Sequence, residues 1–406
     1  MEKWDVIVIG GGPAGSQAAW QCAARGLRTL VLEKERLPRE KPCGGGVSLA
    51  AENLLPVPLP AQVAEVRCHL LRTVHQGWRR ELSYPQPFLA SVRRAPLDAH
   101  LLDMAQGAGA EVRDARAAEC LEAKPGRVRV RSTRHGQAGI SFPLRDEPQD
   151  LVATAIVVAD GVTGKVSRAL RGRWQRQDLA LCYTAEADWD GHHDDPYRRN
   201  GIEVHYAFVP MGYGWLFPKR DSIYVGLGAH LPAARGLDAA FARFVRLNGL
   251  RLSSPIRAAL VPVGGPARNL VADGWLLVGD AAGLADPFSG EGIRYAIGSG
   301  QAAGRVLADC LERGSLLTRT ALAPYARLVR ATWGPQLAMG RVMLTVLHRF
   351  PAALMEIYFR HDEPFRRTLD MLAGRGAYGS LLRWVLPRLP FLILARSVPT
   401  VREPSL

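Results

Sequence analysis

The chain has 406 residues, of which 48% are hydrophobic and 22% charged, and its formal net charge is +14. Its length favours two or three packed units, and its composition argues against a disordered chain. It also argues against a membrane-spanning protein, because no apolar run approaches the roughly 20 residues that cross a bilayer. The first predicted strand begins at residue 4, which leaves no room for a signal peptide, so the sequence predicts a cytoplasmic protein.

The positive charge comes mainly from arginine and favours anionic partners, either a phosphorylated cofactor or the surface of an anionic membrane that the protein contacts peripherally. An arginine-rich, merely solvated surface is the competing interpretation. Nucleic acid is not expected, because no basic helix, zinc finger or RNA-binding aromatic motif accompanies the arginines. The six cysteines are scattered without a C-x-x-C pair, so no metal site is predicted.

The first predicted elements form a strand, a glycine turn and a helix. Residues 4–9 are apolar and β-branched, and they run directly into Gly10-Gly11-Gly12-Pro13-Ala14-Gly15 and an alanine-rich stretch. Gly10, Gly12 and Gly15 have the spacing of a dinucleotide-binding turn, in which Ala14 opens the helix. A diphosphate is then expected at the helix N-terminus, where free N–H groups and the helix dipole favour negative charge.

A second apolar run, residues 27–32, ends at Glu33 and Lys34. A carboxylate about 20 residues after the glycine turn is typical of the group that hydrogen-bonds an adenosine ribose, so both residues are predicted to contact the cofactor. The alternative is that Glu33 is the solvated end of an ordinary strand.

The rest of the chain suggests that this nucleotide fold is interrupted and later resumed. Residues 91–110 predict an extended entry followed by a helix, and the buried-strand pattern of residues 151–159 ends in Asp160-Gly161. Short alternating runs over 178–265 predict an antiparallel sheet, and residues 275–280 predict another buried strand. We therefore divide the chain into a nucleotide-binding domain, a substrate domain, a return segment and a helical C-terminal region, at 1–175, 176–268, 269–325 and 326–406.

Asp280 and the loop that follows it indicate that the nucleotide is FAD. A carboxylate at the end of a central strand can hold the polyol of FAD, and Gly290, Gly292 and Ile293 open a helix whose N–H groups would face the flavin ring. A second nucleotide fingerprint is missing, because Gly298 and Gly300 fall inside a predicted helix, where they favour close packing. NADPH or another reductant is then expected only as a transient electron donor.

Taken together, these motifs resemble the flavoprotein superfamily of aromatic hydroxylases, halogenases and geranylgeranyl reductases, over residues 1 to about 320. The resemblance rests on the glycine turn, Val92-Arg93-Arg94, Ala159-Asp160-Gly161, and Gly279-Asp280 with Pro287. Two further motifs, Lys41-Pro42-Cys43-Gly44-Gly45-Gly46 and Gly212-Tyr213-Gly214-Trp215-Leu216-Phe217-Pro218-Lys219, are similar to signatures of the geranylgeranyl reductase family. The chain departs from hydroxylases after Gly161 and from halogenases at Tyr213-x-Trp215-x-Phe217-Pro218, which lacks their W-x-W-x-I-P signature.

The resemblance implies an α/β fold: a Rossmann-like FAD-binding domain of the aromatic-hydroxylase type, an inserted, mainly antiparallel substrate domain and a helical C-terminal region. It implies an FAD-dependent reductase that saturates carbon–carbon double bonds of a hydrophobic isoprenoid chain on a lipid, quinone or pigment precursor. Reduced flavin would give a hydride to one alkene carbon, and a proton would be added to the other. It also places Cys43, Gly44, Arg94 and Asp160 at the cofactor.

The candidate catalytic residues are Cys43, Tyr213 and Trp215. Cys43 is a candidate proton donor or ring-positioning group, or else a small thiol that fills a tight turn. Tyr213, Trp215 and Phe217 alternate, so on a strand they share one face and either line a tunnel for a prenyl chain or pack in the core. His205 and Tyr206 are further candidates for lining the pocket.

Three alternatives remain open from the sequence. An FAD-dependent monooxygenase or halogenase-like enzyme acting on an aromatic or peptide substrate would share the cofactor motifs. A flavin-containing lipid carrier without turnover would share the basic surface and the apolar end. That end, residues 381–394, carries Trp384 and Phe391 among aliphatic residues and arginine, and it either contacts a membrane or docks on the protein's own surface.

Overall fold

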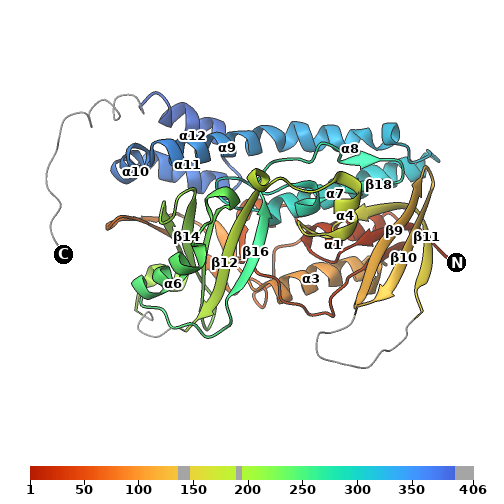
Figure 1. Ribbon diagram of the computed structural model, residues 1–406, viewed down its shortest axis with the longest axis horizontal. Coiled ribbons are helices and arrows are strands. Elements are labelled where there is room, and N and C mark those ends of the chain that lie inside the picture. The colour runs from red at the N-terminus through yellow and green to blue at the C-terminus, as the bar shows by residue number, and fades with distance from the viewer. Residues whose placement is uncertain (136–146, 189–193, 389–406) are drawn as a thin grey trace.

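The computed structural model describes residues 1–135, 147–188 and 194–388. Figure 1 shows two sheets side by side along the long axis, with helices α8 (Arg319–Thr332) and α9 (Gly334–Arg349) running along one side of both. The fold is thus the predicted α/β architecture with a helical C-terminal region.

The first sheet is mainly parallel at its centre and carries the glycine turn. Its strand order is β17-β18-β11-β1-β2-β8, and an antiparallel pair, β10 and β9, extends it from β11. The bounds of these strands are β1 Glu2–Ile9, β2 Thr29–Leu32, β8 Glu111–Arg113, β9 Arg116–Lys124, β10 Arg127–Arg134, β11 Gln149–Val158, β17 Val271–Ala272 and β18 Trp275–Leu277.

The register of the parallel strands aligns their carboxyl ends. Ile9 is paired with both Leu32 and Val158, and Val158 is paired in turn with Leu277. All four side chains are buried, in keeping with the apolar runs that predict a sheet covered on both faces. The residues that follow these four strands therefore meet at one edge, which is where ligands bind in open α/β sheets.

Two helices begin near this edge and pack against each other. Helix α1 (Pro13–Ala23) follows the glycine turn, and α7 (Ile293–Glu312) follows the loop after β18. A Cβ atom on Gly300 would lie 2.1 Å from the carbonyl oxygen of Ala14, so only glycine permits this approach of the helices. This confirms that the small residues within 298–300 serve close packing. Helix α3 (Arg94–Gly107) covers the sheet beside α1.

The second sheet is the substrate-side sheet. Its order is β16-β12-β15-β14-β13-β5-β6, and it is antiparallel except where β13 pairs with β5. The bounds are β5 Leu70–His75, β6 Trp78–Ser83, β12 Leu179–Ala187, β13 Gly201–Tyr206, β14 Gly212–Pro218, β15 Ile223–His230 and β16 Arg257–Pro262. Strands β5 and β6 precede the segment 176–268 that we assigned to this sheet from the sequence. They join it because β5 forms a parallel ladder with β13.

Smaller elements connect the two sheets. They are the three-stranded sheet of β3 (Gly46–Ser48), β7 (Leu89–Ser91) and β4 (Val66–Cys68), together with α2 (Leu49–Glu52), α4 (Lys165–Arg171), α5 (Pro196–Asn200) and α6 (Leu237–Leu247). The C-terminal region continues from α9 into α10 (Pro351–Arg360), α11 (Asp362–Leu372) and α12 (Tyr378–Val385). Figure 1 places these helices above the second sheet.

The predicted apolar end is only partly described. Trp384 packs against the core under α12, and its ring lies edge-on to His361 at 5.3 Å, so this part docks on the protein itself. Phe391 lies outside the described residues. Within the described ranges, no single helix is long and apolar enough to span a bilayer. One pair of helical segments, 319–349 and 351–360, meets that length and composition only when taken together across a bend of 105°.

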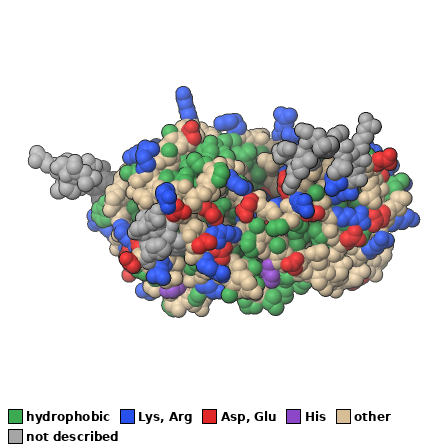
Figure 2. Space-filling view, turned by 90° about the horizontal axis from the view of Figure 1, so that it is seen from below, with side chains coloured by type: hydrophobic (Ala, Val, Ile, Leu, Met, Phe, Trp, Pro, Cys, Tyr) green, Lys and Arg blue, Asp and Glu red, His purple; other side chains and the backbone are tan. Residues whose placement is uncertain are grey.

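Charged side chains are mixed over the surface. Figure 2 shows Lys and Arg scattered among Asp and Glu on the visible face rather than gathered into one basic stripe. The net charge of +14 therefore does not mark an interface on this face.

Candidate active site

The glycine turn forms a tight cradle at the end of β1. Gly10 has φ +104°, and a Cβ on Gly15 would lie 1.8 Å from the Gly10 carbonyl oxygen, so both positions require glycine. Pro13 occupies the first turn of α1, and no side chain caps that helix at Gly12. Gly12 and Ala14 line the main cavity of the molecule, so the uncapped helix N-terminus opens onto it.

Glu33 braces this turn. It is only 4% exposed, which excludes the solvated strand end that the sequence left open. Its Oε2 accepts a hydrogen bond from the backbone N–H of Gly11 at 2.8 Å, and Arg39 lies 3.2 Å from the same carboxylate. Lys34, also predicted to contact the cofactor, is exposed, lies 3.8 Å from the Glu35 carboxylate and does not line the cavity.

The return segment supplies the other half of the site. Asp280 lies in the 3-10 turn η3 (Gly279–Ala282) directly after β18, and a Cβ on Gly292 would lie 3.4 Å from its Oδ1. The first turn of α7 has no side-chain cap at Gly292. Asp280, Gly290, Gly292 and Ile293 all line the cavity, and the Lys41 ammonium lies 3.8 Å from the Asp280 carboxylate.

Asp160 is placed differently from the prediction. Its carboxylate accepts hydrogen bonds from the backbone N–H groups of Val166 and Ser167, at 2.9 and 3.1 Å. It therefore caps α4, while its neighbours Ala159 and Gly161 line the cavity in its place. Burial raises the pKa of Asp160, although these hydrogen bonds oppose the rise. The sequence motif correctly identifies a loop at the cavity, but the Asp160 side chain caps helix α4.

The cavity is continuous from the glycine turn to the C-terminal helices and has a volume of about 610 Å³. One half is lined by backbone and polar groups of the turns after β1, β11 and β18. The other half is largely apolar and is formed mainly by β13, β14 and the helices α9, α11 and α12. Its side chains include Leu71, Ile202, Val204, Tyr206, Tyr213, Trp215, Phe217, Phe288, Leu344, Met371, Leu372 and Leu381.

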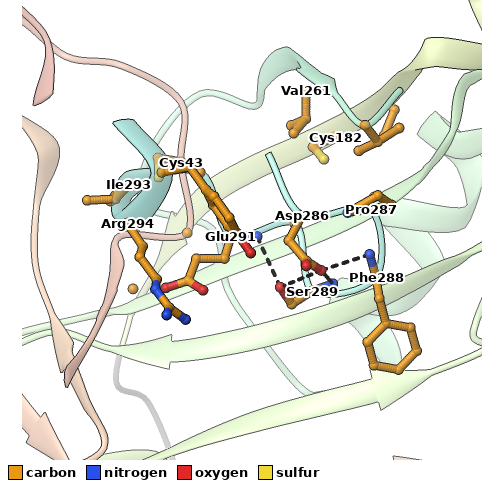
Figure 3. Close-up of a pocket in the computed structure, with 18 of the residues that line it drawn as sticks. Cys43, Cys182, Val261, Asp286, Pro287, Phe288, Ser289, Glu291, Ile293 and Arg294 are labelled. Carbon is orange, nitrogen blue, oxygen red and sulfur yellow. Dashed lines mark hydrogen bonds between the residues drawn. The ribbon is translucent and has the colours of Figure 1, made fainter. Parts of the chain in front are cut away.

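Cys43 lies where the two halves meet, close to the start of α7 (Figure 3). Its Sγ accepts a hydrogen bond from the Gly45 N–H at 3.4 Å, and its side chain lies beside the buried Arg94 guanidinium. Arg94 is held by Asp98 through two hydrogen bonds of 2.9 and 2.8 Å. The Arg94 guanidinium, paired with Asp98, is therefore a cationic neighbour of the Cys43 thiol.

Lys219 fixes the loop that carries Cys43. The side chain is 1% exposed, and its Nζ donates to the carbonyl oxygens of Val92 and Gly44 at 2.7 and 3.3 Å and to Ser91 Oγ at 2.9 Å. Burial lowers the pKa of Lys219 to about 8. The sequence motif contains Lys219, but without the fold nothing shows that it reaches back to residues 44 and 92.

The alternating aromatic residues share one face, as predicted. Tyr213, Trp215 and Phe217 all line the cavity from β14, and the Tyr213 hydroxyl donates to the carbonyl oxygen of Ser289. Burial raises the pKa of Tyr213 well above its usual value. Trp215 is buried, and its Nε1 has no hydrogen-bond partner among the described residues.

The two candidates on β13 point to opposite faces. Tyr206 lines the cavity, whereas His205 hydrogen-bonds Glu203 at 2.6 Å and packs edge-on against Phe244. The prediction that both line the pocket is therefore wrong for His205. Consecutive side chains on a strand alternate between faces, so only one of the pair can reach the cavity.

Sequence reasoning missed the residues that the C-terminal helices contribute, such as Thr368 and Tyr378, and it missed Asp286 in the loop before α7. A carboxylate between Ala285 and Pro287 in an otherwise apolar and glycine-rich loop is the one signal that could have identified Asp286.

The residues present fit FAD. Two uncapped helix N-termini, of α1 and α7, open onto one cavity and suit a diphosphate and a ring edge that gains negative charge on reduction. The carboxylate oxygens of Glu33 retain acceptor capacity beyond their backbone bonds. Two further observations fit a bound FAD. Trp215 Nε1 has no partner among the described residues, and residues 10 and 15 leave space that only glycine permits.

Comparison with known proteins agrees with this geometry. A family model described as FAD dependent oxidoreductase matches residues 5–93. The digeranylgeranylglycerophospholipid reductase 2 of Methanothermobacter thermautotrophicus is 32% identical, over 77% of this chain and 80% of that protein. The chain belongs to the geranylgeranyl reductase family of FAD-dependent oxidoreductases.

Two further comparisons support the family assignment and the fold. The menaquinone reductase of Mycobacterium tuberculosis is 31% identical, over 75% of this chain and 76% of that protein. A geranylgeranyl bacteriochlorophyll reductase-like protein from Thermoplasma acidophilum has the same fold, with a TM-score of 0.80 at 22% identity, over 98% of this chain and 99% of that one. This geranylgeranyl reductase family member is thus an FAD-dependent enzyme.

Proposed function

We propose that the enzyme saturates carbon–carbon double bonds of an isoprenoid chain carried by a lipid, a quinone or a pigment precursor. The observation that carries the proposal is the single cavity, which joins the cofactor turns to an apolar half lined by aliphatic and aromatic side chains. An extended hydrocarbon chain fits such a wall, because burial of apolar surface drives its binding. Relatives named as reductases of menaquinone and of digeranylgeranylglycerophospholipid support this substrate class, since both molecules carry isoprenoid chains.

Each part of the site has a role in this proposal. The N-terminus of α1 would hold the diphosphate of FAD, Glu33 the ribose, Asp280 the polyol and the N-terminus of α7 the ring edge. Bound FAD, once reduced, supplies the hydride. The apolar half excludes water and holds the alkene in place, which an unactivated double bond needs because it is a poor hydride acceptor.

Cys43 and the aromatic residues of β14 act at the junction of the two halves. Cys43, between the Arg94 guanidinium and the loop held by Lys219, either positions the ring or passes a proton. Tyr213 and Trp215 wall the place where the alkene would lie. NADPH or another reductant is the electron donor in this proposal, and it binds only transiently. Contact with an anionic membrane surface, where isoprenoid lipids reside, is part of the same proposal and rests on the net charge of +14.

The test is an anaerobic incubation of the photoreduced protein with prenyl diphosphates, prenylated quinones and archaeal-type lipids, read by mass spectrometry. The proposal expects reoxidation of the flavin and a product heavier by two hydrogens for each reduced bond. Products of unchanged mass across the panel, with flavin that stays reduced, would contradict it. Incorporation of oxygen when air is admitted would favour the monooxygenase alternative, and tight lipid binding without reoxidation would favour a carrier.

A further inference from the structure

The hairpin of β5 and β6 carries an exposed aromatic side chain. Trp78 is the first residue of β6, and 59% of its surface is exposed. Among the tryptophans and phenylalanines that the structure describes, it is the only one that is mostly exposed. A single exposed ring is common on protein surfaces, so the neighbours of Trp78 decide what it does.

The ring of Trp78 continues into further aromatic side chains on the last helices. It lies 6.3 Å from the ring of Phe359 on α10. Two residues further along the chain, the ring of His361 lies edge-on to that of Trp384 on α12. Phe359 and Trp384 pack on the protein with one side and remain partly exposed. We call Trp78, Phe359 and Trp384 the aromatic patch.

Each ring of the aromatic patch has an arginine beside it. Arg79 and Arg360 follow the first two rings in the chain, and their side chains are 52% and 62% exposed. The Arg388 guanidinium lies over the ring of Trp384, 4.0 Å from its centre. Tryptophan rings next to arginine are typical of protein segments that lie in the interface between a membrane and water.

The charge of the last helices is mainly positive. Residues 349–388 hold seven arginines and four carboxylates. Three of the carboxylates pair with arginines: Glu356 with Arg360, Glu363 with Arg367, and Asp362 with Arg80 of the hairpin. The exposed arginines that have no ion-pair partner among the described residues are Arg349, Arg366, Arg375, Arg383 and Arg388. This excess of positive charge complements the headgroups of anionic lipids.

The helices that carry this charge also form part of the cavity. Met371 and Leu372 of α11 and Leu381 of α12 line its apolar half. Figure 1 shows α10, α11 and α12 together at one end of the molecule, away from β9, β10 and β11 of the first sheet. A bilayer in contact with the outer side of these helices would therefore meet the part of the protein that binds the hydrocarbon chain in the proposed function.

We propose that the aromatic patch and the arginines of α10, α11 and α12 dock the enzyme on the surface of an anionic lipid bilayer. This inference rests on the proposed function, in which the substrate is an isoprenoid lipid, and it assigns the membrane contact to one surface. The rings enter the headgroup layer, where their apolar faces leave water. The arginines keep their guanidinium groups at the lipid phosphates.

The test is flotation of the full-length, FAD-loaded protein with vesicles of phosphatidylglycerol or of phosphatidylcholine, at low and at high salt. The proposal expects binding to the phosphatidylglycerol vesicles that weakens at high salt, because salt screens exposed charges. Binding to phosphatidylcholine should be much weaker. Equal binding to both kinds of vesicle at low salt would contradict the role of the arginines.

Surface variants locate the contact. Trp78→Ser should lower the affinity for phosphatidylglycerol vesicles by about tenfold, and Arg383→Gln and Arg388→Gln by about fivefold for each arginine replaced. Leu247→Ser, at a 64% exposed leucine on α6, is the matched control and should bind as the wild type does. Wild-type affinity in both Trp78→Ser and the double arginine variant would overturn the assignment of this surface.

Brominated lipids report whether the ring enters the bilayer. Phosphatidylglycerol with bromine on the upper acyl carbons should quench the fluorescence of the wild type more than that of Trp78→Phe, since the ring of Trp78 lies closest to the bromine. Equal quenching of the two proteins would contradict insertion. A dimer that Trp78→Ser dissociates, without vesicle binding, would assign the patch to a second copy of the chain. Vesicle binding that requires removal of residues 389–406 would show that the chain's own end covers the patch, and either result would overturn the proposal.

Vesicle binding needs no turnover, so this inference and the proposed function fail separately. Binding to anionic vesicles through Trp78, without reduction of any prenyl compound, would retain the docking surface and contradict the proposed function. Reduction of a prenyl substrate in detergent by a protein that binds no vesicles would retain the proposed function and overturn the docking surface.

Discussion

Lys219 makes a measurable prediction about how the stability of the protein depends on pH. Its ammonium group is buried, and burial lowers its pKa from 10.5 to about 8. Between these values the unfolded chain binds a proton on Lys219 that the folded protein does not, so the free energy of unfolding should rise with pH across this interval. Below about pH 8 Lys219 is charged in both the folded and the unfolded protein, and above about pH 10.5 it is neutral in both. Outside the interval it therefore does not change how the free energy of unfolding depends on pH.

The size of the effect follows from the same interval. At about 1.4 kcal/mol for each pH unit, the gain from Lys219 amounts to about 3 kcal/mol. Lys219→Met has a side chain of similar length without the charge, and it should lose this gain. The three lost hydrogen bonds to residues 44, 91 and 92 change the stability of the variant at every pH and do not alter the slope.

The assay is urea unfolding of the FAD-bound protein, followed by tryptophan fluorescence, at pH values below, within and above the interval. The difference in unfolding free energy between wild type and Lys219→Met should shift toward the wild type by about 3 kcal/mol as pH rises. Other titrating groups, including buried tyrosines, contribute equally to both proteins and cancel. Parallel pH profiles for the two proteins would refute the reasoning.

Three further changes test the rest of the site. Cys43→Ser should keep the yellow cofactor but slow alkene reduction in the anaerobic assay. Full activity of this variant would mean that the thiol only packs in the loop. Gly15→Ala places a methyl group 1.8 Å from a carbonyl oxygen and should abolish FAD absorbance, whereas Gly107→Ala, with open space around it, should bind FAD normally. Arg94→Met removes one of the two arginines that pair with the buried Asp98, and it should lower the free energy of unfolding in urea by about 3–5 kcal/mol. A loss below about 1 kcal/mol would argue against a stabilising role of the Arg94–Asp98 pair.

Much of the cofactor half was predictable because its signals are local. The glycine spacing, the apolar runs and the carboxylates at strand ends each report on a few neighbouring residues. Parallel pairing then brings the strand ends together, since Ile9, Leu32, Val158 and Leu277 share a register. The prediction for Asp160 was less successful because a carboxylate after a strand can face either a ligand or the next helix.

The substrate half was harder to predict because its contacts join distant parts of the chain. Strand β5 pairs with β13, which lies about 130 residues later, and no local pattern predicts that ladder. The alternation on β14 was enough to predict that Tyr213, Trp215 and Phe217 share one face. It could not show which face of β13 lies toward the cavity, and so which of His205 and Tyr206 lines it. The hydrogen bond between Tyr378 and Asp286 spans 92 residues and could be found only in three dimensions.

The arrangement of the cavity wall has a consequence for how such enzymes diversify. The cofactor-binding part of the cavity is formed by turns in the first 162 residues and by residues 278–296. Much of its apolar wall comes from β13, β14 and the last helices. If the proposed isoprenoid substrate binds there, mutations in those helices would change which chains are bound while the cofactor-binding turns stay intact. Swapping residues 334–385 between related enzymes would test directly whether these helices decide which apolar substrate is bound.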